Sequence, residues 1–340
     1  MLDQKEYSLT VKQNAKVIEY LKACQSSKGG FSGSPYMEPH IASTYAAVCT
    51  LINIGTEQAL SIINIKGILD FLLKIKHNEC TQSDLPLTCM RTTWPGSFEI
   101  HKNGENDMRA IYCALVIADL LQLLNQHKEL TKGVTEYITQ CQTYEGGIAC
   151  VPFSEAHAGY TYCGLASLLL LGEATKLDLF KLAQWTSNRQ TGEGGFNGRI
   201  GKLVDSCYNF WVGAISELID IALKGKGNYK EEWLVDQYAV QGYTLLCCQE
   251  KTGGMRDKPQ RNADLYHTCY SLAGMSIMQS KSLYKELYEE EKFKAKNKGQ
   301  HQIYLANEQR NSLKRVHPVY CLQHEKVKAA KKYFNNLLSE

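Results

Sequence analysis

The sequence predicts an all-α fold built from repeated helical hairpins that stack on one another. A diglycine or its near relative recurs five times, each time followed by a polar loop and then an apolar segment. Amphipathic segments at helical spacing, such as 131–141 and 176–188, lie between the apolar ones. Because one helical pair cannot bury its apolar faces alone, each pair is expected to pack against its neighbours.

Each diglycine turn marks the end of one helix and the approach to the next. The preceding helix ends at Cys-Gln or Arg-Gln, and the glycines turn the chain as C-terminal helix stops do. In chain order, the apolar helices after the turns are predicted over residues 42–51, 107–121, 158–171, 204–218 and 264–278.

Composition limits the class of protein. A chain of 340 residues with 44% hydrophobic and 21% charged content can bury a large core. Its net charge of +3 is too near neutral for nucleic acid as the main partner. The first residues lack the apolar core of a signal peptide and the apolar runs are shorter than a membrane span, so we expect a cytoplasmic protein. The 13 cysteines lack the spacing of a disulfide framework and are expected to be mostly free thiols.

An aromatic residue falls about a dozen residues after the glycines of every repeat. These residues are Tyr45, Tyr112, Tyr162, Tyr208 and Tyr270. Any one of them alone is best interpreted as a core tyrosine. Five at similar places, each with a phenol that needs a hydrogen-bond partner, indicate an aromatic-walled pocket for a long apolar ligand.

Asp205 and Cys207 stand two positions apart near a predicted helix start. In a continuous helix they would point roughly 200° apart, so they can converge only in the first turn or in the loop before it. Asp-x-Cys is a weak signal, because such an aspartate more often caps the helix. A third ligand is available at the equivalent place in the last repeat, His267. The three would form a zinc site that leaves one position open for substrate.

Four segments resemble the β subunits of protein prenyltransferases, most closely those of the farnesyltransferases. They are residues 145–166, 197–211, 253–274 and 317–327. The likeness covers the chain from about Val17 to its end. It implies an α-α barrel, or toroid, of the prenyltransferase and terpene-cyclase type.

The resemblance also implies a role for individual residues. The zinc ligands match Asp205, Cys207 and His267, and Asp257 matches an aspartate that helps to bind Mg²⁺. The residues that hold the isoprenoid diphosphate match His157, Arg199, Lys202 and Tyr208, the last two also with catalytic roles. The residues that line the cavity match Tyr45, Arg109, Tyr112, Cys163, Trp211, Tyr266 and Tyr270.

The activity implied is that of the catalytic β subunit of a zinc-dependent protein farnesyltransferase. Such an enzyme transfers farnesyl from farnesyl diphosphate to the cysteine of C-terminal CaaX motifs, in proteins such as small GTPases. The family works as a heterodimer, in which the α subunit wraps the barrel and contributes a lysine to the diphosphate.

Two other functions stay open. A type I geranylgeranyltransferase or dual-specificity β subunit is the alternative enzyme. Asp257 favours farnesyl, because the type I enzymes carry a lysine there, but the tryptophan partner that farnesyl enzymes give to Tyr270 has no match here. A toroid without enzymatic activity is the third hypothesis, although a structural zinc would normally have four protein ligands.

The chain is predicted to form a single barrel domain over residues 1–340. A surface insertion is expected at 76–97, where the stretch is longer than usual for the family. The charge-dense stretch 280–312 is expected to be a solvated connector.

Overall fold

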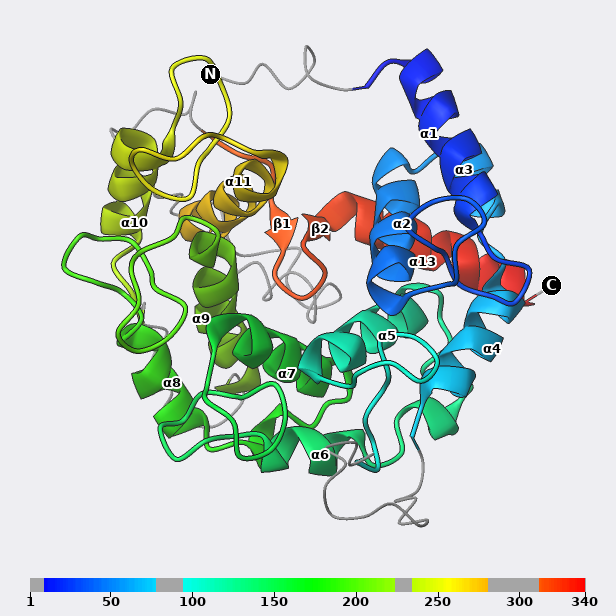
Figure 1. Ribbon diagram of the computed structural model, residues 1–340, viewed down its shortest axis with the longest axis horizontal. Coiled ribbons are helices and arrows are strands. Elements are labelled where there is room, and N and C mark those ends of the chain that lie inside the picture. The colour runs from blue at the N-terminus through cyan, green and yellow to red at the C-terminus, as the bar shows by residue number, and fades with distance from the viewer. Residues whose placement is uncertain (1–8, 78–93, 224–233, 281–311, 340) are drawn as a thin grey trace, which may run out of the picture.

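A computed structural model describes residues 9–77, 94–223, 234–280 and 312–339, and it confirms the predicted toroid. Figure 1 shows an inner and an outer set of helices arranged as a ring. The inner helices are α2 (Ile41–Ile54), α5 (Met108–Leu120), α7 (Ala158–Leu170), α9 (Tyr208–Leu223) and α11 (Leu265–Gln279). The outer helices are α1 (Val11–Cys24), α4 (Ile65–Ile75), α6 (Val134–Gln140), α8 (Leu179–Ser187) and α10 (Gln237–Tyr243).

The predicted surface insertion and the predicted charged connector lie largely outside the described residues. The insertion expected at 76–97 falls largely on 78–93, and the connector expected at 280–312 falls on 281–311. Among the residues that the structure does describe, no helix combines the length and apolar character needed to span a membrane.

The C-terminal part of the chain closes the ring and enters its centre. Strands β1 (Val316–His317) and β2 (Leu322–Gln323) pair as an antiparallel hairpin, and α13 (His324–Ser339) follows directly. Helix α13 packs against α2 and α5, while β1 contacts α11. Figure 1 places the hairpin in the middle of the ring. The last and the first repeats are therefore joined through this segment. Short connecting elements are α3 (Glu57–Ser61), η1 (Lys128–Leu130), η2 (Ala174–Lys176) and η3 (Thr244–Cys248).

Four of the five turns have a glycine where another backbone passes against it, while Gly253 of the last turn has no described neighbour within 4 Å of its added Cβ. Gly29 and Gly146 have φ of 89° and 106°, in the left-handed region. A Cβ on Gly29 would lie 1.8 Å from the carbonyl oxygen of Gly67, and one on Gly146 would lie 2.3 Å from that of Lys181. Each of these four turns thus packs directly on the first turn of the following outer helix.

The glutamine before each turn fixes the same contact. Gln142 accepts a hydrogen bond from the N–H of Asp178 at 2.9 Å and donates to its carbonyl at 3.1 Å. Gln190 makes the same pair of bonds to Asp236, at 2.7 and 2.9 Å. Asp178 and Asp236 cap α8 and α10. The recurring Gln of the sequence therefore ties one repeat to the helix cap of the next.

The inner helices also have equivalent caps. Each cap lies ten positions after the second glycine of its repeat, or after Ser97 in the second repeat. Its side chain accepts a hydrogen bond from a backbone N–H two or three residues later. These cap residues are His40, Asp107, His157, Asp205 and Asp264.

The residue after each of the first four caps donates its N–H to a loop carbonyl of the following repeat, and we call these contacts the rim bonds. They are Ile41 to Ile100 (2.8 Å), Met108 to Cys150 (3.1 Å), Ala158 to Gly198 (2.8 Å) and Ser206 to Asp257 (2.9 Å). The starts of successive inner helices are therefore joined along one rim of the toroid, and side chains at the caps come to lie at that rim.

Helix α9 begins later than the sequence predicted. Val204 pairs in an extended bridge with Asn197, and residues 205–207 form a turn before α9 starts at Tyr208. The predicted start at 204 was wrong because this segment continues the glycine-rich loop instead of entering the helix. Asp205 and Cys207 therefore lie in a turn, where side chains two residues apart can converge.

Candidate functional site

The structure brings Asp205, Cys207 and His267 together at the rim. One ligand atom from each lies within 4.8 Å of the other two, and Asp205 Oδ1 is 3.3 Å from His267 Nε2. Within the described ranges this is the single group of three or more His, Cys, Asp or Glu side chains arranged in this way. We call these residues the metal triad.

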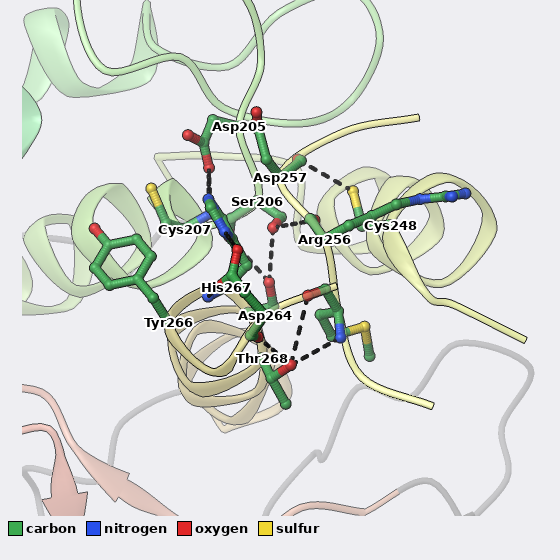
Figure 2. A network of polar contacts seen from close by, with 12 residues as sticks. Asp205, Ser206, Cys207, Cys248, Arg256, Asp257, Asp264, Tyr266, His267 and Thr268 are labelled. Carbon is green, nitrogen blue, oxygen red and sulfur yellow. Dashed lines mark hydrogen bonds and ion pairs between the residues drawn. The ribbon is translucent and has the colours of Figure 1, made fainter. Parts of the chain in front are cut away.

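The imidazole of His267 is held in the orientation that metal ligands adopt. His267 Nδ1 lies 2.6 Å from Asp264 Oδ2, and the backbone N–H of His267 donates to Asp264 Oδ1 at 2.8 Å. These bonds lower the pKa of Asp264 below its usual value. Figure 2 shows His267 between Asp205 and Asp264, with Nδ1 bonded to Asp264 and Nε2 turned toward Asp205, where it would be available to a metal ion. A carboxylate behind the histidine is the usual second partner at a zinc site.

The thiol of Cys207 is buried beside a carboxylate. Its exposed fraction is 4%, and its backbone N–H donates to Asp205 Oδ1 at 2.8 Å. Burial, followed by the charge of Asp205, raises the pKa of the Cys207 thiol well above its usual range. A thiolate at this place needs a cation to stabilise it. One sulfur, one nitrogen and one carboxylate ligand suit Zn²⁺.

Asp257 accepts a hydrogen bond, through its backbone carbonyl, from the turn that carries Asp205 and Cys207, and one oxygen of its carboxylate is unpaired in the described part of the chain. Its Oδ2 pairs with the ammonium of Lys258. Its Oδ1 is buried and finds no hydrogen-bond partner among the residues that the structure describes. An unpaired buried carboxylate oxygen suits a hard cation such as Mg²⁺. The magnesium role stays a prediction.

Two of the residues predicted to hold diphosphate form a hydrogen-bonded pair. The N–H of Gly159 donates to His157 Nδ1 at 3.1 Å, so the proton of a neutral ring sits on Nε2. Nε2 lies 3.1 Å from the Tyr208 hydroxyl. Burial, and then the charge of Arg199, lowers the pKa of His157. With His157 donating, the Tyr208 hydroxyl can direct its own proton to an anion.

The cations of this group stand on the loop before the metal triad. Arg199 forms an ion pair with Glu155, and Lys202 is exposed three residues later. Gly198 lies against Tyr208, because a Cβ there would be 2.2 Å from the phenol oxygen. We call His157, Arg199, Lys202 and Tyr208 the anion cluster.

An unbroken series of aromatic rings lines the inner helices. Successive ring centroids are 5.6 Å apart for Tyr45 and Tyr112, 5.2 Å for Tyr112 and Tyr162, and 5.0 Å for Tyr162 and Phe210. Phe210 continues the series to Tyr270 at 5.5 Å. The prediction that Tyr208 belongs to this series was wrong. Phe210 holds the equivalent place, fifteen residues after Gly195, and Tyr208 joins His157 at the rim instead.

The phenols of this aromatic wall hold the C-terminal hairpin. Tyr112 donates to the carbonyl of Val319 at 2.8 Å, and Tyr162 donates to that of Pro318 at 2.9 Å. Tyr45 reaches the carbonyl of Tyr320 at 3.4 Å. The polar partners that buried tyrosines require thus come from a segment more than 150 residues later in the chain.

The remaining predicted lining residues fall into two places. Trp211 donates to the Tyr266 hydroxyl at 3.3 Å and lies 4.4 Å from Tyr270 between ring centroids, which joins the aromatic wall to the metal triad. Arg109 is ion-paired with its own cap residue, Asp107, on α5, and Cys163 is buried in α7.

Sequence reasoning missed several residues that hold the site. Asp264 could have been found, because it occupies the tenth position after Gly254, as Asp205 does after Gly195. Glu155, Ser206 and Phe210 carry no signal without the partner that the fold supplies.

Comparison with known proteins gives a consistent family. A model of the prenyltransferase alpha-alpha toroid domain matches residues 1–322. The β subunit of protein farnesyltransferase from Pisum sativum is 37% identical over 318 residues, which are 77% of this chain and 72% of that protein. The corresponding subunit of Schizosaccharomyces pombe is 32% identical over 322 residues, 94% of this chain and 77% of that protein.

A solved structure shares the fold. Candida albicans protein geranylgeranyltransferase-I, complexed with GGPP, superposes with a TM-score of 0.70 at 20% identity, over 97% of this chain and 87% of that one. The β subunit of geranylgeranyl transferase type-1 from Arabidopsis thaliana is 34% identical over 257 residues, 72% of this chain and 60% of that protein. The chain therefore belongs to the family of protein prenyltransferase β subunits.

Proposed function

We propose that this chain is the catalytic β subunit of a zinc-dependent protein farnesyltransferase. The observation that carries the proposal is the metal triad, with three protein ligands and an oriented histidine, on the same rim as the anion cluster. Three protein ligands leave one zinc position for a substrate thiol. The similarity to farnesyltransferase β subunits supports the farnesyl donor.

The transfer forms one bond and breaks one. The cysteine sulfur of a CaaX peptide bonds to C1 of farnesyl, the bond from C1 to oxygen breaks, and diphosphate leaves with the electron pair while the thiol loses its proton. A zinc ion held by Asp205, Cys207 and His267 would favour the thiolate. His157, Arg199, Lys202 and Tyr208 would stabilise the charge that grows on the diphosphate, so their effect falls on the transition state.

A direct test is transfer to a panel of C-terminal CaaX peptides with farnesyl or geranylgeranyl diphosphate as donor. We expect farnesyl to be the preferred donor. A preference for geranylgeranyl would favour the type I alternative, and comparable rates would favour a dual-specificity enzyme. A zinc-loaded heterodimer that transfers neither group would contradict the proposed activity.

Magnesium should act through Asp257. We expect removal of Mg²⁺ to slow transfer without much weakening of lipid binding, because the ion would act on charge that develops as diphosphate leaves. Changing Asp257 to Lys should make the rate far less sensitive to magnesium, since an ammonium can partly replace the cation. Asp257→Asn, which lacks that charge, is the matched control and should stay slow at every concentration. Superimposable magnesium titrations for Asp257→Lys and wild type would refute the assignment.

The partner implied is an α subunit, and two exposed aromatic residues support a docked neighbour on the loop side. Tyr36 and Phe153, each six residues after a second glycine, are fully or almost fully exposed with φ of 70° and 68°. The backbone conformation belongs to the repeat, because Asn103, Gly201 and Gln260 at the equivalent places also have positive φ, whereas the two exposed rings offer apolar surface that a partner can cover. Phe153 lies two residues before Glu155, which pairs with Arg199 of the anion cluster. We place the α subunit over this rim. We also propose that the chain forms a single domain and that it is cytoplasmic.

A further inference from the structure

We propose that Ser206 is a positioning residue for the metal triad. The inference rests on the proposed zinc site. Ser206 separates the two ligands Asp205 and Cys207, and its side chain is completely buried. Its hydroxyl fixes the turn that carries these ligands against the helix that carries His267.

The hydroxyl of Ser206 uses both its donor and its acceptor capacity. It donates to the carbonyl of Arg256 at 2.7 Å and accepts from the Ser271 hydroxyl at 2.8 Å. Ser271 is also completely buried and lies on α11, one turn after His267 and on the same face. Figure 2 shows the Ser206 hydroxyl between the metal triad and the segment of Arg256 and Asp257. One buried group therefore joins three segments: the turn before α9, the start of α11, and the loop that bears Asp257.

The other repeats show that the fold does not need this hydroxyl. The residues that make the equivalent rim bonds are Ile41, Met108 and Ala158, and all three are apolar. The positions equivalent to Ser271, seventeen residues after each second glycine position, are Ala47, Ala114, Gly164 and Val212. The serine pair thus occurs where the metal triad is, and the backbone rim bond is made elsewhere without it.

The physical effect of the pair is to limit movement between ligands on different elements. Asp205 and Cys207 come from a turn, whereas His267 is fixed by Asp264 at a helix start. Without the hydroxyl, the backbone N–H of Ser206 would still donate to Asp257, but the bond to Arg256 would be lost and the Ser271 hydroxyl would keep only its longer contact, 3.4 Å, with the Ser206 carbonyl. Groups that orient metal ligands typically change metal affinity by about 10- to 100-fold.

The test is the zinc affinity of the full chain, measured by competition with a chromophoric chelator. The variant Ser206→Ala should fold, because an alanine, Ala158, already makes the equivalent rim bond in another repeat. We expect zinc binding to weaken about 10- to 100-fold. We also expect the absorption bands of the Co²⁺-substituted variant to shift as the ligand geometry relaxes. The matched control is Ser167→Ala, which removes a buried hydroxyl that bonds only within α7.

Ser271→Ala is a second variant in case the first does not fold. It keeps the bond from Ser206 to Arg256 and removes only the link to α11, so a smaller loss of zinc affinity is expected. A purely structural role would lower the melting temperature of the metal-free chain and leave zinc affinity and the Co²⁺ spectrum as in wild type. That result would overturn the inference.

The outcome for Ser206 can be separated from that for the proposed function. A wild-type chain that binds zinc but transfers no prenyl group would contradict the function, while the affinity of Ser206→Ala would still decide the inference. A wild-type chain with no zinc affinity would overturn both.

Discussion

Replacing Cys207 or His267 by Ala is expected to abolish transfer while leaving the binding of isoprenoid diphosphate largely intact. The residues at 207 and 267 belong to the metal triad, whereas the proposed diphosphate contacts come from the anion cluster, His157, Arg199, Lys202 and Tyr208. Loss of a metal that supplies several kcal/mol of stabilisation corresponds to a rate decrease of about 10³-fold or more. Zinc content by mass spectrometry should fall from about one ion per chain to near zero.

Cys24→Ala is the matched control for this experiment. Cys24 is a buried free thiol at the end of α1 and belongs to neither cluster. Its replacement should leave zinc content and transfer unchanged. Full activity of the wild-type enzyme with no zinc detectable by mass spectrometry would contradict the mechanism.

The purified chain without an α subunit is expected to give no measurable turnover. The cations of the anion cluster are few for a diphosphate, because Arg199 is already paired with Glu155 and Lys202 stands exposed on a loop. A missing donor to a developing anion typically costs about 10²- to 10³-fold in rate. Co-expression with an α subunit should restore transfer, measured with a fluorescent CaaX peptide.

The control for this prediction is the state of association. Size-exclusion chromatography with light scattering should verify that the chain assayed alone is a monomer, and zinc loading should be equal in both preparations. Robust turnover by such a monomer would refute the need for a partner.

The helical repeats could be predicted because their signals are local. A diglycine turn, an apolar helix and an amphipathic helix each appear within a few residues, and the structure confirms them in order. The contacts between repeats could not be predicted in the same way. The rim bonds and the glutamine bonds depend on which backbone groups the ring brings together. Every residue has a backbone carbonyl, so the amino-acid sequence does not indicate which one is the partner.

The metal triad was predicted as a set, while the register of the aromatic wall was not. Asp205, Cys207 and His267 all stand within thirteen residues after the second glycine of their repeats, near the start of an inner helix, so the repeat itself pointed to their proximity. Tyr208 and Phe210 lie two residues apart, and only the observed start of α9 decides which of them faces the wall. The hairpin of Val316 to Gln323 was missed because strands of two residues have no periodicity.

At residues 318 and 319 the hairpin is attached to the ring through its main chain and not through its side chains. Tyr112 and Tyr162 donate to main-chain carbonyls of residues 318 and 319, and every amino acid offers the same carbonyl at those places. Exchanging the side chain at residue 318 or 319 therefore leaves these tyrosine hydrogen bonds in place, whereas the side chain of Tyr320 is itself an attachment, because its hydroxyl donates to Asp119 of α5. At residues 318 and 319 the size and polarity of this central segment can thus change by single substitutions while its attachment to α5 and α7 is kept.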